Sequence, residues 1–138
     1  MDESPGLIEL TGGEKALDRA SLVRLVESPE VAPIPNPDGA WVGVANLRGE
    51  VIPVTDLGIL SGSGPVERPV MIALRTGGRS FGLLVEGVER TVEASGEGDL
   101  PDEPEPGDPP WLLPAPPGSP RVIDPELLLE DPRLGSGT

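Results

Sequence analysis

Side chains that commonly carry out catalysis are scarce in this sequence. Its 138 residues include no histidine and no cysteine, and Lys15 is its only lysine. Acidic groups are plentiful, because 24 aspartates and glutamates stand against 10 basic residues. Acid–base or nucleophilic chemistry would therefore have to rest on carboxylates, serines or Lys15.

The densest group of carboxylates lies in a proline-rich stretch, residues 95–110, that we expect to form a flexible loop. Such a stretch buries too little apolar surface to offset the entropy of ordering it. Carboxylates held in water also lack an environment that tunes them for catalysis. The acids do not have the glycine and ligand spacing of an EF-hand, and Gly62-Ser63-Gly64 is followed by proline, unlike a phosphate-binding loop. The sequence therefore predicts a protein without enzymatic activity, cofactor or metal.

The net charge of −14 restricts the class of partner. Nucleic acids and anionic membrane surfaces repel such a chain by the same Coulomb interaction that attracts basic surfaces. No stretch approaches the roughly 18 apolar residues of a membrane-spanning helix, and residues 1–5 have no segment typical of a secretory signal. We expect a cytoplasmic protein that binds other proteins, without nucleic-acid binding or direct membrane insertion.

Short apolar runs separated by turn residues indicate an all-β fold. One hairpin is expected over residues 41–60 with its turn at 46–49, and a second over residues 70–85. Residues 22–26 fit either a helical turn or a strand. We favour a strand, and four prolines that follow it exclude a long helix. Further strands are expected at 7–10, from about 16, at 88–92 and at 121–123, before a short helix at 125–129 with Asp124 as N-cap.

The chain length allows one domain, which we expect to span residues 1–138 with flexible ends at 1–6 and 134–138. Its core should be mainly aliphatic, because Trp41, Phe81 and Trp111 are the only aromatic residues. The apolar group 111–113 fits a lid over part of this core better than an exposed binding anchor.

The segment Val42–Leu60, VGVANLRGEVIPVTDLGIL, resembles the most recognisable block of the CheW-like family, with identities at Asn46, Leu47, Arg48, Gly49, Pro53, Asp56 and Leu57. Two weaker blocks, one before and one after this segment, fall in the family's order, so that the resemblance covers residues 7–92. It implies two small SH3-like five-stranded β-barrels packed together. It also implies a coupling function, in which the protein joins the regulatory domain of a CheA-type histidine kinase to the cytoplasmic tip of a chemoreceptor. Other CheW-like domains at membrane-associated receptor arrays are further partners that the resemblance implies.

The same resemblance indicates the surfaces that contact partners. Aliphatic residues near 22–26 and 85–88 either line the groove that receives a receptor helix in this family or belong to the core. The turn at 46–49 forms the other candidate surface. The candidate partner-binding residues are Leu22, Arg24, Leu25, Val26, Asn46, Leu47, Arg48, Gly49, Val85 and Val88.

Three residues of the main block have local structural interpretations. Gly49 is expected to take a positive φ in the hairpin turn. Pro53 within a strand predicts an edge or bulge position, because proline has no backbone donor. Asp56 is expected to accept hydrogen bonds from nearby backbone amides rather than to contact a partner.

Arg24 departs from the family pattern, in which a glutamate usually occupies this position and pairs with the arginine equivalent to Arg48. Either Glu27 or Glu30 replaces that glutamate, or Arg48 is free to meet a partner, or the contact between the two lobes is built differently. A desolvated pair of arginines would cost several kcal/mol. This departure leaves open an alternative function, a divergent scaffold or insulating module that has lost kinase or receptor binding and serves another assembly, such as motility machinery.

Overall fold

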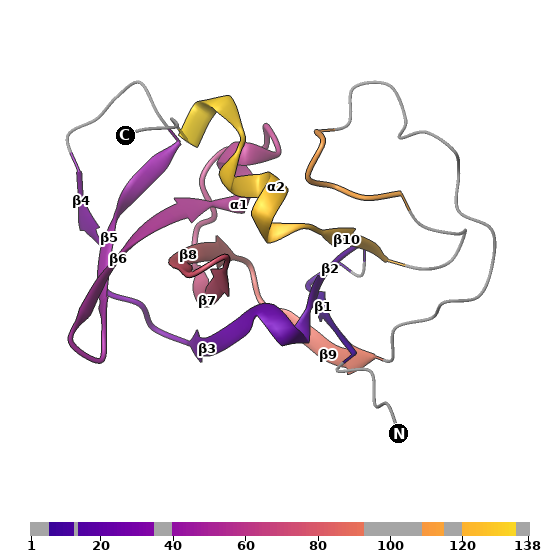
Figure 1. The fold of residues 1–138 in the computed structure, drawn as a ribbon, viewed down its shortest axis with the longest axis horizontal. Helices are drawn as coiled ribbons and strands as arrows, with labels where there is room; N and C mark the ends of the chain where they lie inside the picture. Colours follow the sequence, from indigo (N-terminus) through magenta and orange to yellow (C-terminus); the bar gives the residue numbers. More distant parts are fainter. Residues whose placement is uncertain (1–5, 13, 35–39, 93–108, 115–119, 135–138) are drawn as a thin grey trace.

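The computed structural model describes residues 6–12, 14–34, 40–92, 109–114 and 120–134, which form two sheets and a few short helices. The smaller sheet has the strand order β10-β2-β1-β9 and the larger one the order β3-β7-β8-β6-β5-β4 (Figure 1). The smaller sheet contains β1 (Leu7–Leu10), β2 (Lys15–Asp18), β9 (Val88–Val92) and β10 (Arg121–Ile123). The larger sheet contains β3 (Leu22–Val26), β4 (Ala32–Pro33), β5 (Trp41–Leu47), β6 (Glu50–Asp56), β7 (Val70–Thr76) and β8 (Arg79–Val85).

Four short helical segments connect and cover the strands. They are η1 (Arg19–Ser21), α1 (Leu57–Leu60), α2 (Pro125–Leu129) and η2 (Pro132–Leu134). The N-cap predicted for α2 is confirmed, since the Asp124 carboxylate accepts hydrogen bonds from the amides of Glu126 and Leu127 at 2.9 and 3.2 Å, with Pro125 in the first turn. Helix α1 was not predicted, because the sequence after β6 continues the apolar pattern of the strand.

The hairpin between β5 and β6 has a two-residue turn in which both central residues have positive φ. Arg48 has φ 53° and Gly49 has φ 89°, as in the type I′ turns that match the twist of a hairpin. Asn46 supports the turn, because its side-chain oxygen accepts a hydrogen bond from the Gly49 amide at 2.8 Å. The positive φ predicted for Gly49 is confirmed, and that of Arg48 was not anticipated.

The main core joins the two sheets and the C-terminal helix. Leu10, Leu17 and Ile123 of the smaller sheet share it with β7 and β8 of the larger sheet and with α2, whose Leu128 is fully buried. Figure 1 shows α2 lying between the two sheets, where it packs against β7. A second, smaller cluster lies within the larger sheet and includes Ile52 and Met71. Hydrophobic packing therefore holds the two lobes together as well as building each of them.

The predicted all-β fold in two small lobes with a short C-terminal helix is confirmed, and it is consistent with two SH3-like barrels. Among the described residues, the hydrogen-bonded sheets have four and six strands. Pro53 does not lie on an edge strand, because β6 is interior, yet its pairing with β8 begins only at Val54. Gly6 and Leu134, which we expected to belong to flexible ends, are buried, and the rest of both predicted ends lies outside the described residues. Most of the predicted acidic loop lies outside the described residues.

Candidate functional site

A shallow groove lies where the two sheets meet. Its volume is about 180 Å³, and the residues that line it are Ile8, Arg19, Leu22, Leu25, Ile72, Val88 and Thr91. They come from β1 and β9 of the smaller sheet, from β3 and β7 of the larger sheet and from η1 between them. Small-molecule sites usually have at least about 300 Å³. The groove is therefore better suited to one or two side chains of a protein partner.

A β-bulge in β3 shapes the groove. Leu22 pairs with Leu74 and Arg24 with Ala73, so that Val23 is the extra residue in the strand. In a regular strand, residues three positions apart point to opposite faces. The bulge brings Leu22 and Leu25 to the same face, and Leu25 remains 41% exposed there.

The structure brings together three of the aliphatic residues predicted to contact partners and separates two others. Leu22, Leu25 and Val88 line the groove. Val26 does not, since it lies on the other face of β3 and packs against the second core cluster. Val85 is 2% exposed and belongs to the main core, so its assignment to the groove is wrong.

Arg24 is exposed on β3, which forms one edge of the larger sheet. Its neighbour Leu25 faces the groove, and because side chains alternate along a strand, Arg24 points to the opposite face together with Val26. A charged residue on an edge strand also discourages unwanted pairing with another sheet.

A second exposed surface surrounds the β5–β6 hairpin, which carries the predicted residues Asn46, Leu47, Arg48 and Gly49. Arg48 is exposed, and within the described part of the chain it has no ion pair, so neither Glu27 nor Glu30 replaces the expected partner. Beside the hairpin is an open hollow of about 530 Å³, lined by Glu30, Val31, Ala32, Val44, Ala45, Asn46 and Val51.

Val51 was missed by the sequence analysis although it is the most exposed large aliphatic residue in the described structure, at 63%. Ile34, next to β4, is also exposed at 38%. A signal was present for Val51, because Ile52 and Val54 are the buried residues of β6, and strand alternation then places Val51 outside. Exposed aliphatic residues beside a hollow are typical of protein-binding surfaces.

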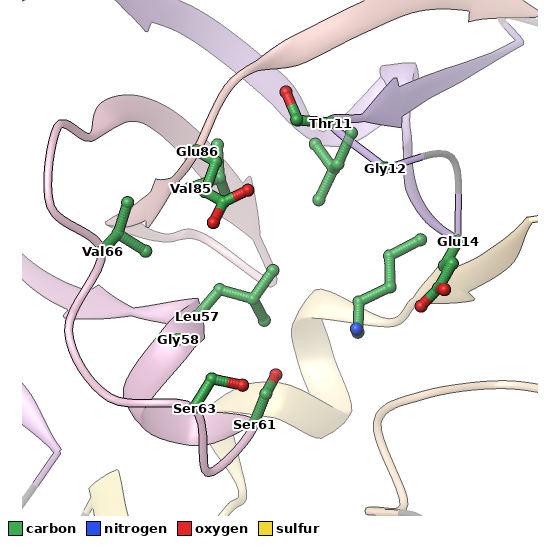
Figure 2. A pocket seen from close by; sticks show the side chains of 12 residues that line it. Thr11, Gly12, Glu14, Leu57, Gly58, Ser61, Ser63, Val66, Val85 and Glu86 are labelled. Atoms are coloured by element: carbon green, nitrogen blue, oxygen red, sulfur yellow. The ribbon is translucent and has the colours of Figure 1, made fainter.

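A third cavity, of about 180 Å³, lies between the β1–β2 turn and the loop after α1 (Figure 2). Figure 2 shows the Ser61 and Ser63 hydroxyls and the Glu14 and Glu86 carboxylates around Leu57, with the two carboxylates on opposite sides. Among the described residues no group of three histidine, cysteine, aspartate or glutamate side chains could hold a metal ion. Lys15 lines this cavity as well, so the cavity has both positive and negative side chains around it.

Asp56 begins α1 and also holds the loop that follows it. Its carboxylate, 2% exposed, accepts hydrogen bonds from the amides of Ile59 and Val66, both at 3.1 Å. The predicted backbone-binding role of Asp56 is confirmed. The residue fixes the loop beside the third cavity and is not available to a partner.

Residues 7–111 match the sequence model of the CheW-like domain family, and this range is about three quarters of the chain. The chain belongs to the CheW-like family. A solved relative is the scaffolding protein TtCheW from Thermoanaerobacter tengcongensis, which is 25% identical in sequence. The TM-score between the two structures is 0.67, and the similarity covers 87% of this chain and 88% of the other. These findings confirm the predicted family and support a scaffold or adaptor role in chemotaxis.

The CheW-like match ends at Trp111. The side chain of this residue forms a contact with the C-terminal segment that follows the match. The Trp111 indole is buried and donates a hydrogen bond to the Asp131 carboxylate at 3.0 Å. Asp131 also accepts hydrogen bonds from the Arg133 guanidinium, and this bonding lowers its pKa from 3.8 to about 2. The indole of Trp41 donates to the Leu134 carbonyl. As predicted, Trp111 belongs to the core and is not an exposed anchor.

No helix in the described residues is long and apolar enough to cross a membrane.

Proposed function

We propose that this protein is a cytoplasmic adaptor that couples a CheA-type histidine kinase to chemoreceptors at membrane-associated arrays. The observation that carries the proposal is the aliphatic groove between the two sheets in a chain of the CheW-like family. A receptor helix places its aliphatic side chains on Leu22, Leu25 and Val88, which the groove leaves accessible. Such helix-in-groove binding uses anchors one helical turn apart.

The regulatory domain of the kinase binds the hairpin surface, which is Arg48 with Val51 and the adjoining hollow. Val51 gives this surface the exposed aliphatic area that is typical of the centre of a protein interface. The exposed Arg48 lies at the rim of the surface. Arg48 has no ion pair within the described residues and can therefore donate to a carboxylate or carbonyl of the partner.

An adaptor must hold both partners at once, and the arrangement of the strands supports this. The groove strand β3 and the strand β4 beside the hairpin surface lie at opposite edges of the larger sheet. The groove and the hollow beside the hairpin have no lining residue in common. Two partners bound at these edges do not need to compete for the same residues.

Reciprocal substitutions test the proposal. The kinase regulatory domain and a soluble fragment of the receptor tip, both from the same organism, are titrated by calorimetry into the wild type, Leu25→Glu and Val51→Glu. We expect Leu25→Glu to weaken the receptor by about tenfold or more and to leave the kinase unchanged, because it places a charge in an apolar contact. Val51→Glu should do the reverse, and Arg48→Ala should weaken the kinase alone.

The pattern of losses distinguishes the proposal from its alternative. Wild-type protein that binds neither partner at several hundred micromolar would contradict the coupling role and favour the insulating or scaffold module. Equal loss of both partners in each variant would show misfolding, which circular dichroism of the free variants detects.

A further inference from the structure

The charge of the groove differs in sign from the charge of the whole chain. Arg19 is the only charged residue among the described residues that line the groove, whereas the chain carries a net charge of −14. Arg19 lies in η1, the short segment through which the chain passes from β2 of one sheet to β3 of the other. It is exposed, and so its guanidinium is accessible to a partner seated in the groove.

The carboxylate next to Arg19 in the chain and the one on β1 each have another partner, and Glu89 of β9 is exposed but does not line the groove. Asp18 accepts a hydrogen bond from the Ala20 amide at 2.9 Å and caps η1. Glu9 forms an ion pair with Arg90 at 3.0 Å. This pair lies on the opposite face of the smaller sheet, because Ile8 faces the groove and side chains alternate along β1. Within the described residues, Arg19 itself has no ion pair.

A partner that covers the groove removes water from Arg19 as well as from the aliphatic residues around it. Loss of water from a charged group is unfavourable unless the partner supplies an opposite charge or hydrogen-bond acceptors. A carboxylate on the partner meets this requirement and gains a charge-assisted hydrogen bond. A lysine or arginine at the same place would be opposed by Arg19, although the net charge of the chain attracts it from a distance.

We propose that Arg19 makes the groove selective for a helix that presents a carboxylate on the same face as its aliphatic anchors. The anchors contact Leu22, Leu25 and Val88, and the carboxylate lies within one helical turn of them, where it reaches the η1 end of the groove. The inference rests on the proposed receptor-binding role of the groove and adds the chemistry by which the groove chooses its helix.

Two arginines that differ in position provide a matched comparison. Arg19→Glu and Arg24→Glu change the net charge equally, and both residues are exposed, but Arg24 lies on the face of β3 away from the groove. Calorimetric titration of the receptor-tip fragment should show about tenfold weaker binding to Arg19→Glu, as for a close interfacial charge pair. Binding to Arg24→Glu should stay within about twofold of the wild type, and Arg19→Lys should retain most of the affinity.

A set of three designed helices tests the charge preference even if the receptor fragment does not bind. The peptides share leucines at positions i and i+4 and differ only at i+3, where they carry glutamate, glutamine or lysine. Binding is followed by NMR through the methyl groups of Leu25 and Val88. The wild type should prefer the glutamate peptide, with an advantage that shrinks at high salt, and Arg19→Glu should prefer the lysine peptide.

The outcomes separate this inference from the proposed function. Absence of receptor binding by the wild type, together with a glutamate preference among the peptides, would overturn the receptor role and support the charge selectivity. Receptor binding that weakens equally in Arg19→Glu and Arg24→Glu, or no order among the peptides, would overturn the selectivity and leave the receptor role intact.

Discussion

Replacing Asp131 by asparagine should destabilise the fold by about 1–2 kcal/mol at pH 7. The carboxylate is buried and accepts hydrogen bonds from the Trp111 indole and from the backbone and side chain of Arg133. Its pKa falls from 3.8 to about 2, chiefly through the Arg133 side chain, which corresponds to roughly 2 kcal/mol. Since 47% of the Arg133 side chain is exposed, solvent screening lowers that figure toward 1 kcal/mol.

The stabilisation by Asp131 should depend on pH in a defined direction. A carboxylate whose pKa is lower in the folded state binds fewer protons there than in the unfolded state. Its contribution is therefore complete above the unfolded pKa of 3.8 and is lost as the pH falls toward 2. The difference in unfolding free energy between wild type and Asp131→Asn should be constant above about pH 5 and should shrink steadily below about pH 4.

Urea denaturation followed by circular dichroism between pH 7 and pH 3 measures this difference. Glu130→Gln is the matched control. Glu130 is the neighbour of Asp131 in the chain and its side chain is exposed, so this variant removes the same charge from the surface. The control should change stability by less than about 0.5 kcal/mol at every pH. A loss in Asp131→Asn that equals the control, or that stays constant down to pH 3, would refute the assignment of the stabilisation to the charged form of Asp131.

Three further substitutions test contacts within the larger sheet, each by the same urea denaturation. Gly43→Ala should cost more than about 2 kcal/mol, because a Cβ atom there would lie 2.3 Å from a backbone oxygen of β4; a loss below about 0.5 kcal/mol would show that β4 moves aside. Thr55→Val should cost about 1 kcal/mol, since it removes a buried hydroxyl that donates to a backbone carbonyl at 2.8 Å; an unchanged stability would contradict that bond. Asp56→Ala should lower the free energy of unfolding by about 2 kcal/mol, because the carboxylate accepts hydrogen bonds from two backbone amides. Asp56→Asn should recover part of this stability, and equal losses in both variants would contradict the capping role.

Features that depend on a few neighbouring residues could be predicted from the sequence. The turn at Asn46–Gly49 follows from the need for positive φ at its end and from an asparagine that can bond to the backbone. The cap at Asp124 likewise involves only the next three residues. The hydrogen bonds of this turn and this cap join residues that are close in the chain, and so tertiary packing does not override them.

Features set by the neighbours of a strand could not be predicted in the same way. Val85 looked like a groove residue, but β8 lies between β7 and β6 and is buried from Phe81 to Val85 on both faces. Alternation disappears in such a strand, so the sequence carries no sign of which face each residue takes. The separation of Val26 from Leu22 and the placing of Leu22 and Leu25 on one face depend on the bulge at Val23, because a bulge shifts every later side chain to the other face.

The exposure of Arg24 and Arg48 explains how the fold tolerates an arginine where the family pattern predicts a glutamate. Two desolvated arginines in contact would cost several kcal/mol, whereas exposed like charges cost little because water and salt screen them. The structure leaves both side chains exposed, Arg24 on an edge strand and Arg48 in a hairpin turn. The arginine at position 24 therefore changes the surface charge of the protein outside the groove and not the packing that holds the fold together.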